Sequence, residues 1–159
     1  MKATMIHRPA MRTALLIVLA MLVVAGIGKF SRASVGNISK ADLAGSWQAT
    51  LVGNTGCGLV SMLVNFTLNG AGTATNATIT THLSGPPSSG CVDGSVTTGQ
   101  TFTVNTLSSN GSGTAGLTCG PGCGWGFNIQ VSPDRGVANL TDVNTSNPFN
   151  TPTGTMIHQ

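Results

Sequence analysis

Alternation of apolar and polar residues recurs through the chain after residue 45 and constrains its fold more than any other feature. Successive side chains of a β-strand point to opposite faces, so a period of two predicts strands that bury one face. The clearest runs are Val60, Met62, Val64, Phe66 and Leu68, and then Trp125, Phe127, Ile129 and Val131. No segment after residue 45 repeats apolar residues at helical spacing for three turns. The pattern therefore predicts an all-β protein.

We expect eight strands, near residues 46–52, 59–68, 73–82, 100–107, 113–119, 123–131, 136–142 and 153–158. Asn69-Gly70 and Asn110-Gly111 can supply the positive φ angles of tight hairpin turns. The segment 132–136 is typical of a type I turn closed by a left-handed glycine. Short connections predict an antiparallel meander, with longer loops at 84–99 and 143–152. Because an open sheet would expose its apolar face, we expect a small closed barrel, with a two-layer β-sandwich as the alternative.

The first 33 residues differ sharply from the rest of the chain. Basic residues precede an apolar run over residues 13–27, and the small residues Ser31 and Ala33 follow it. This order is that of a secretory signal peptide, and the apolar run is shorter than the ~20 residues of a membrane-spanning helix. We expect a signal-peptide helix over 1–33 that is cleaved after Ala33, with an uncleaved anchor as the alternative. A linker or N-terminal arm over 34–44 and a barrel domain over 45–159 would follow.

The predicted mature chain is poor in charge. Five of the seven Lys and Arg residues lie in the leader, leaving Lys40 and Arg135 against four aspartates, a net charge of −2. A protein that binds nucleic acid needs several clustered cations to displace counterions from phosphates. The charge distribution therefore excludes nucleic acid as a partner. It fits an exported protein that is secreted, periplasmic or held at the cell surface, with no stable membrane span after cleavage.

Four cysteines, Cys57, Cys91, Cys119 and Cys123, follow the leader. In an exported chain they favour two disulfides, and we expect Cys57–Cys91 and Cys119–Cys123 among the three pairings. Zinc is the alternative, but a structural zinc site usually has paired CxxC spacing, so no metal is expected. Alternate connections of a meander lie at the same end. We therefore expect all four cysteines to meet at one end of the barrel, with the 143–152 loop.

Groups for catalysis are few. The body has no Glu and no Tyr, and no Gly-x-Ser-x-Gly segment marks a nucleophilic serine. An enzyme would have to use Asp93, Asp142 or His82 at the loop end of the barrel. The sequence thus favours a non-enzymatic protein without a cofactor.

Three large aromatic residues, Trp47, Trp125 and Phe127, are the candidate ligand contacts. Large aromatic side chains can line the cavity of a small barrel. The alternative is that they simply fill the barrel core. A cavity of roughly 300 Å³ or more, open at one end, would favour ligand binding.

Gly45-Ser46-Trp47, at the start of the first strand, resembles the Gly-x-Trp signature of the lipocalin and calycin barrels. That resemblance implies that Trp47 closes one end of a lipocalin-like barrel. Three further features are Gly-Ser-Gly-Thr at 111–114, Asp142 after the penultimate strand, and Gly154-Thr followed by Gln159. Together they are similar to small uncharacterised exported β-meander proteins of bacteria such as Acidobacteria. This likeness implies no particular activity.

The sequence leaves three functions open. The first is an exported, non-enzymatic barrel that binds a small apolar molecule or acts structurally at the cell surface. The second is an adhesive, carbohydrate-binding or matrix protein that displays hydroxyl and amide side chains toward a surface carbohydrate. The third is an enzyme with Asp and His at the loop end. The oligomeric state is not predicted.

Overall fold

The computed structural model describes residues 36–85, 90–120, 123–143 and 151–159. The predicted leader and most of the 143–152 loop lie outside these residues. Among the described residues, no helix has the length and apolar character needed to cross a membrane. A short 3₁₀ helix, η1 (Lys40–Leu43), precedes eight strands. The strands are β1 (Gly45–Thr55), β2 (Gly58–Leu68), β3 (Thr73–Leu83), β4 (Ser95–Leu107), β5 (Ser112–Gly120), β6 (Cys123–Val131), β7 (Val137–Asp142) and β8 (Thr153–His158).

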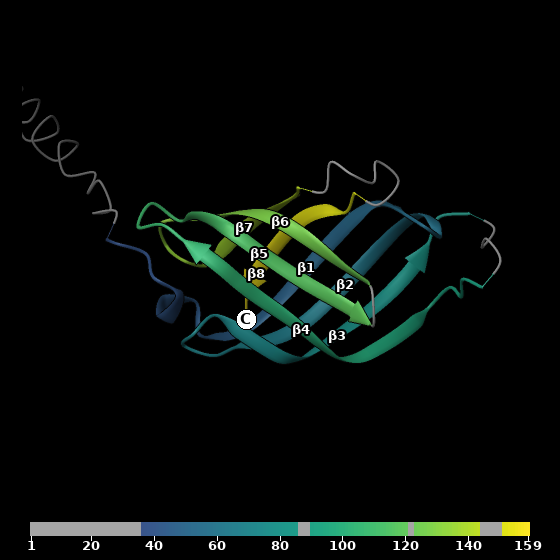
Figure 1. Ribbon diagram of the computed structural model, residues 1–159, viewed down its shortest axis with the longest axis horizontal. Helices are drawn as coiled ribbons and strands as arrows, with labels where there is room; N and C mark the ends of the chain where they lie inside the picture. The colour runs from purple at the N-terminus through teal and green to yellow at the C-terminus, as the bar shows by residue number, and fades with distance from the viewer. Residues whose placement is uncertain (1–35, 86–89, 121–122, 144–150) are drawn as a thin grey trace, which may run out of the picture. The chain divides into compact units, whose positions relative to one another are not determined.

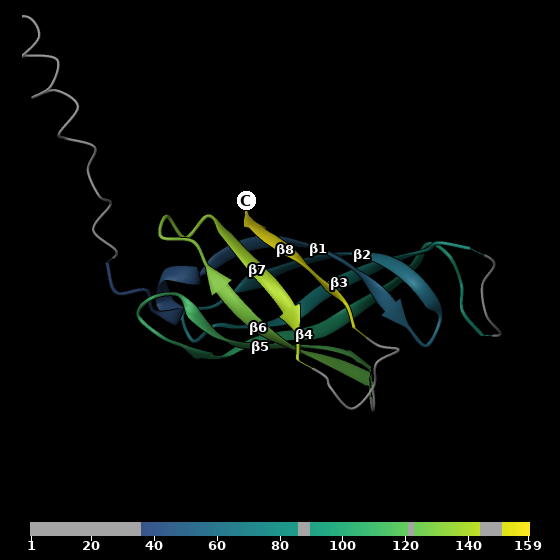
Figure 2. The same ribbon diagram turned by 90° about the horizontal axis from the view of Figure 1, so that it is seen from above.

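The eight strands form a closed antiparallel barrel (Figures 1 and 2). Each strand pairs with the next one along the chain, and β8 pairs back with β1 in the register Leu51↔Gly154. The predicted meander and its closure into a barrel are confirmed, and the sandwich alternative is not what forms. Closure leaves no unpaired sheet edge, so the backbone hydrogen bonds continue around the barrel.

The interior is built from the alternating residues. Every apolar residue predicted to face inward on β2 and β6 is buried. No polar or charged residue is buried among the described residues. Inside the barrel, the rings of Phe66 and Phe102 stack with their centroids 4.4 Å apart. Apolar burial of this kind, at roughly 25 cal/mol per Å², is the main force that closes the sheet.

The seam between β1 and β8 depends on a glycine. Gly154 lies opposite Leu51, and a Cβ atom at this position would overlap the carbonyl oxygen of Thr50. A residue without a side chain is required where two backbones approach so closely. Gly154 therefore allows the last strand to pair with the first.

Two of the three turns differ from the sequence prediction. At 69–72 the positive φ belongs to Gly72 (78°) and not to Asn69-Gly70, because the Asn69 side chain accepts two backbone N–H bonds and lengthens the turn. At 132–136 the left-handed residue is Arg135 (62°) rather than Gly136. Gly111, with φ of 86°, takes the positive angle predicted for the Asn110-Gly111 turn.

Strand β4 begins at Ser95, whereas the sequence predicts a loop until residue 99. Its first residues pair with the end of β3, in the register Thr81↔Ser95. They show no alternation because most are exposed, and Gly99 interrupts the strand with a φ of 70°. The loop between β3 and β4 is therefore shorter than expected.

The segment before β1 covers one end of the barrel, which we call the arm end. Ile38 and Leu43 are buried in the core, and the indole Nε1 of Trp47 donates to the carbonyl oxygen of Leu43 at 2.8 Å. The Lys40 ammonium donates to a carbonyl of β4, and Arg135 lies 3.7 Å from Asp42. The segment predicted as a linker or arm is thus packed against the barrel.

Candidate functional site

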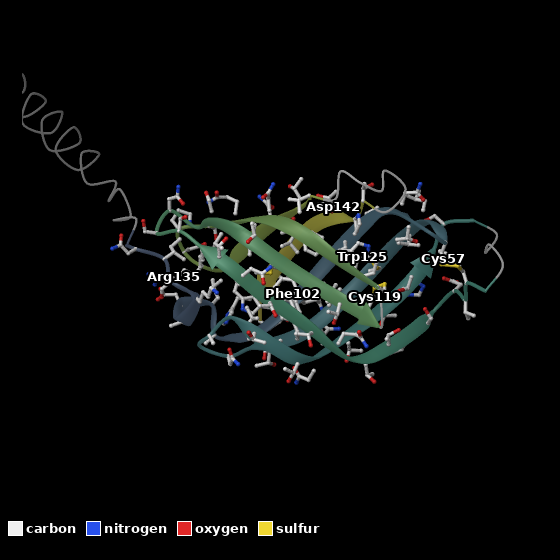
Figure 3. All side chains as sticks on the ribbon, viewed as in Figure 1. Cys57, Phe102, Cys119, Trp125, Arg135 and Asp142 are labelled. Atoms are coloured by element: carbon white, nitrogen blue, oxygen red, sulfur yellow. A yellow bond between two sulfur atoms is a disulfide. The ribbon has the colours of Figure 1, made fainter. Side chains whose placement is uncertain are left out.

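The other end of the barrel carries both disulfides, and we call it the disulfide end. Cys57 is bonded to Cys91, and Cys119 to Cys123, so the predicted pairing is confirmed. The four cysteines come from three different connections, which the meander brings to one end. Figure 3 shows Cys57 and Cys119 toward this end and Arg135 toward the other.

A pocket of about 360 Å³ opens at the disulfide end. Most of its described lining is apolar, and none of the lining residues carries a charge. The walls come from the ends of β1 and β3, the starts of β2, β4 and β6, and the segment after residue 90. The described lining residues are Thr55, Gly56, Cys57, Val60, Met62, Thr81, Leu83, Gly90, Cys91, Val92, Ser95, Cys123 and Trp125.

The Cys57–Cys91 disulfide forms one wall of this pocket. It joins the β1–β2 turn to the β3–β4 connection, with 5.8 Å between the two Cα atoms. Both cysteines are half-buried and line the pocket. The covalent bond therefore holds a loop wall that has little regular structure of its own.

Trp125 is the largest residue of the lining. It faces inward from β6, opposite Leu117 of β5, and 8% of its surface is exposed. Phe127 lies two residues further along the same strand and is fully buried. Of the three predicted ligand contacts, only Trp125 belongs to the described lining of this pocket. A contact role for Phe127 stays a prediction.

Trp47 lies at the arm end, where its ring packs edge-on against His158 with 5.0 Å between centroids. The parity of the strands explains this separation. Odd-numbered strands of a meander start at one end of the barrel, and even-numbered strands start at the other. Trp47 near the start of β1 and Trp125 near the start of β6 therefore lie toward opposite ends. Trp47 does not belong to the described lining of this pocket, and a ligand role for it stays a prediction.

Between the two ends the barrel is filled by side chains. Phe66, Phe102 and Phe127 are buried to 4% exposure or less. The described lining of the pocket reaches inward only to residues such as Val60 and Met62. The pocket is therefore a cup with its mouth at the disulfide end, and it does not run through the barrel.

Titratable groups lie beside the pocket mouth but on the outer face. His82 Nδ1 is 3.5 Å from Asp93 Oδ1, and both side chains are more than 60% exposed. The backbone N–H of Leu83 donates to Asp93 at 2.9 Å, and this bond is the main cause of a lowered pKa of Asp93. Asp142 is on β7, four strands away from His82 around an eight-stranded barrel. The structure thus brings together two of the three candidate catalytic residues, His82 and Asp93, on a solvated surface.

The described part of the chain contains no group of three or more His, Cys, Asp or Glu residues able to hold a metal ion. At the arm end, hydrogen bonds from Ser39 and Ser132 are the main causes of the lowered pKa values of Asp42 and Asp134, respectively. These carboxylates cap local turns, at the end of the barrel away from the pocket.

Several pocket residues were not singled out from the sequence. Thr81 and Leu83 continue the spacing of two that begins with the buried residues Ala77 and Ile79 on β3, so the alternation already contained them. Ser95 falls in the predicted 84–99 loop, and no local signal indicates that it pairs with Thr81.

Comparison of the chain with protein-family models, with curated proteins and with solved structures found no match.

Proposed function

We propose that this protein is an exported, non-enzymatic β-barrel that binds a small apolar molecule in the pocket at the disulfide end. The observation that carries the proposal is an uncharged, mostly apolar cup of about 360 Å³ that opens at one end of the barrel. Ligand pockets of proteins are concave and mainly apolar, with volumes of roughly 300–1,000 Å³. The disulfides support export, because such bonds persist in oxidising compartments.

The pocket volume sets the ligand size. A dry apolar cavity of about 150 Å³ holds one benzene molecule. On the same scale, a pocket of about 360 Å³ can take about 14 carbons, so a nine-carbon ligand fits with room to spare. At about 0.5 kcal/mol per non-hydrogen atom, a nine-carbon hydrocarbon would bind with about 4.5 kcal/mol, a Kd near 0.5 mM.

Titration of the oxidised protein with indane, a nine-carbon hydrocarbon, tests the proposal through tryptophan fluorescence. Indane should shift the emission of Trp125 and protect it from acrylamide quenching, while Trp47 is already buried. Leu83→Phe adds a ring inside the pocket and should weaken binding about tenfold or more. The matched control Leu63→Phe places the same ring on the outer face of β2, where Leu63 is 36% exposed, and should leave the Kd unchanged. Absence of any indane effect at its solubility limit, or equal weakening by both variants, would count against the proposal.

Adhesion or carbohydrate binding is the second candidate, supported by the many hydroxyl and amide groups on the outer face. Several of them bond to each other across strands, as Gln48 does with Asn65 at 2.9 Å and Thr106 with Thr114 at 2.8 Å. Groups paired in this way have fewer free donors and acceptors for a sugar, so we favour the pocket. Binding to a glycan array that is unchanged in Leu83→Phe would support adhesion instead.

A further inference from the structure

We propose that the ligand of this pocket is electrically neutral and carries one hydroxyl or carbonyl group, which hydrogen-bonds to Thr81 and Ser95. This inference rests on the proposed function, since it concerns the ligand class of the same pocket. Three features of the pocket carry it: a pair of adjacent hydroxyls, an absence of charged lining, and an apolar surface around the rest of the cup.

Thr81 and Ser95 lie directly opposite each other on β3 and β4. Both side chains are half-buried and line the pocket. Within the described part of the chain, neither hydroxyl makes a hydrogen bond to a protein group. The third hydroxyl of the lining differs, because Thr55 accepts the backbone N–H of Cys57 at 3.1 Å. Among the described lining residues, Thr81 and Ser95 therefore have hydroxyls that make no hydrogen bond to the protein and that a ligand can reach.

The remaining lining gives the ligand an apolar environment. Val60, Met62 and Leu83 project into the pocket together with the indole of Trp125. A polar group placed against these side chains would lose its hydrogen bonds to water without replacement. The position of the two hydroxyls thus fixes where the ligand's polar atom must lie. A small number of placed polar groups in an apolar pocket is the usual source of orientation and specificity.

The described lining of the pocket offers no counter-ion for a charged ligand. None of the described lining residues is ionisable, since the three cysteines among them are all held in disulfides. Lys40 and Arg135 are held at the arm end by Asn105 and Asp42. The charged group closest in sequence to the pocket wall is Asp93, next to Val92, and its lowered pKa keeps it anionic. A carboxylate ligand would therefore be desolvated without a counter-ion and beside a negative charge, which is costly.

A matched series on one carbon skeleton tests the inference. Indane, 2-indanol, indane-2-carboxylate and 2-aminoindane differ only in the group at one carbon. The oxidised protein is titrated with each compound at pH 7, and Trp125 fluorescence and backbone amide chemical shifts report binding. We expect 2-indanol to bind about 3–10-fold more tightly than indane, the gain of one or two neutral hydrogen bonds. Indane-2-carboxylate should bind at least tenfold more weakly than indane, because no described lining residue is a cation. 2-Aminoindane should also bind more weakly than indane, because Asp93 is solvated on the outer face and does not belong to the described lining.

Variants locate the polar contact. Thr81→Val and Ser95→Ala remove the hydroxyls with little change of shape and should raise the Kd of 2-indanol to that of indane, without altering the Kd of indane. Thr80→Val is the matched control, because Thr80 is the neighbouring residue on the outward face of β3, opposite Leu63. It should leave every Kd unchanged. Thermal unfolding of each variant confirms that the fold is kept.

The results separate the two proposals. If none of the four compounds binds, the proposed function fails and this inference fails with it. If indane binds but 2-indanol gains nothing, or the carboxylate binds as tightly, the pocket function stands and the neutral polar ligand is refuted. The same holds if Thr81→Val and Ser95→Ala leave the preference for 2-indanol intact.

Discussion

Removal of each disulfide in turn is the sharpest test of how the disulfide end is stabilised. The double variant Cys57→Ala and Cys91→Ala opens a loop with a sequence separation of 34, whereas Cys119→Ala and Cys123→Ala opens one with a separation of 4. In the chain-entropy model, a cross-link stabilises the folded protein by restricting the unfolded chain, and the effect grows with the logarithm of loop length. The two variants remove the same atoms, so the comparison isolates the length of the loop.

The expected magnitudes follow from the separations. A loop of about 34 residues corresponds to about 4 kcal/mol, and a loop of about 4 residues to about 2 kcal/mol. Urea denaturation, followed by tryptophan fluorescence under non-reducing conditions, measures the free energy of unfolding of each variant. We expect the Cys57–Cys91 variant to lose about 2 kcal/mol more than the Cys119–Cys123 variant. Equal losses, or a larger loss for the short loop, would refute the entropic account and assign the stabilisation to contacts in the folded state.

Two further predictions concern the arm end and the pocket mouth. Leu43→Ala removes a fully buried side chain that covers the arm end, and it should lower the free energy of unfolding by about 2–4 kcal/mol, measured in urea. A loss below about 1 kcal/mol would mean that the segment before β1 does not seal the barrel. The pKa of Asp93 is lowered in the folded protein, mainly by the N–H of Leu83, so its stabilising contribution is present above about pH 4 and is lost as the pH falls through the folded value. Asp93→Asn should therefore destabilise the protein at pH 6 but have a smaller effect near pH 2, and a difference from the native protein that does not change with pH would contradict this assignment.

The strands and their inward faces follow from local pattern. On β2 and β6 every inward position from Val60 and from Trp125 onward is apolar, and the buried residues are those that the pattern predicts, although Leu63 adds an apolar residue to the outer face. The meeting of the four cysteines at one end was also predictable, because a meander places alternate connections at the same end, whereas the structure shows which cysteines pair. Strand β4 was harder, since its first residues are exposed and carry no alternation, and the strand exists only because β3 provides a pairing partner.

The pocket itself could be predicted only in part. Its inward residues Thr81 and Leu83 continue the alternating face of β3, and the cysteines mark the end where it opens. Ser95 could not be identified, because its place beside Thr81 depends on pairing between segments separated by a loop. Which tryptophan lines the pocket depends on the end of the barrel at which each strand starts, and this follows from the order of all the strands in the sheet.

By itself, the sequence determined the number of strands, the buried faces of the alternating ones and the separation of charge between the first 33 residues and the rest of the chain, because each depends on residues close together along the chain. Tertiary structure alone decided that residues 38–43 cover one end, that the described residues at the other end form a pocket, and that Thr81 and Ser95 lie side by side in its lining. These features arise where distant segments come together, and such contacts depend on how β1 and β8 close the barrel.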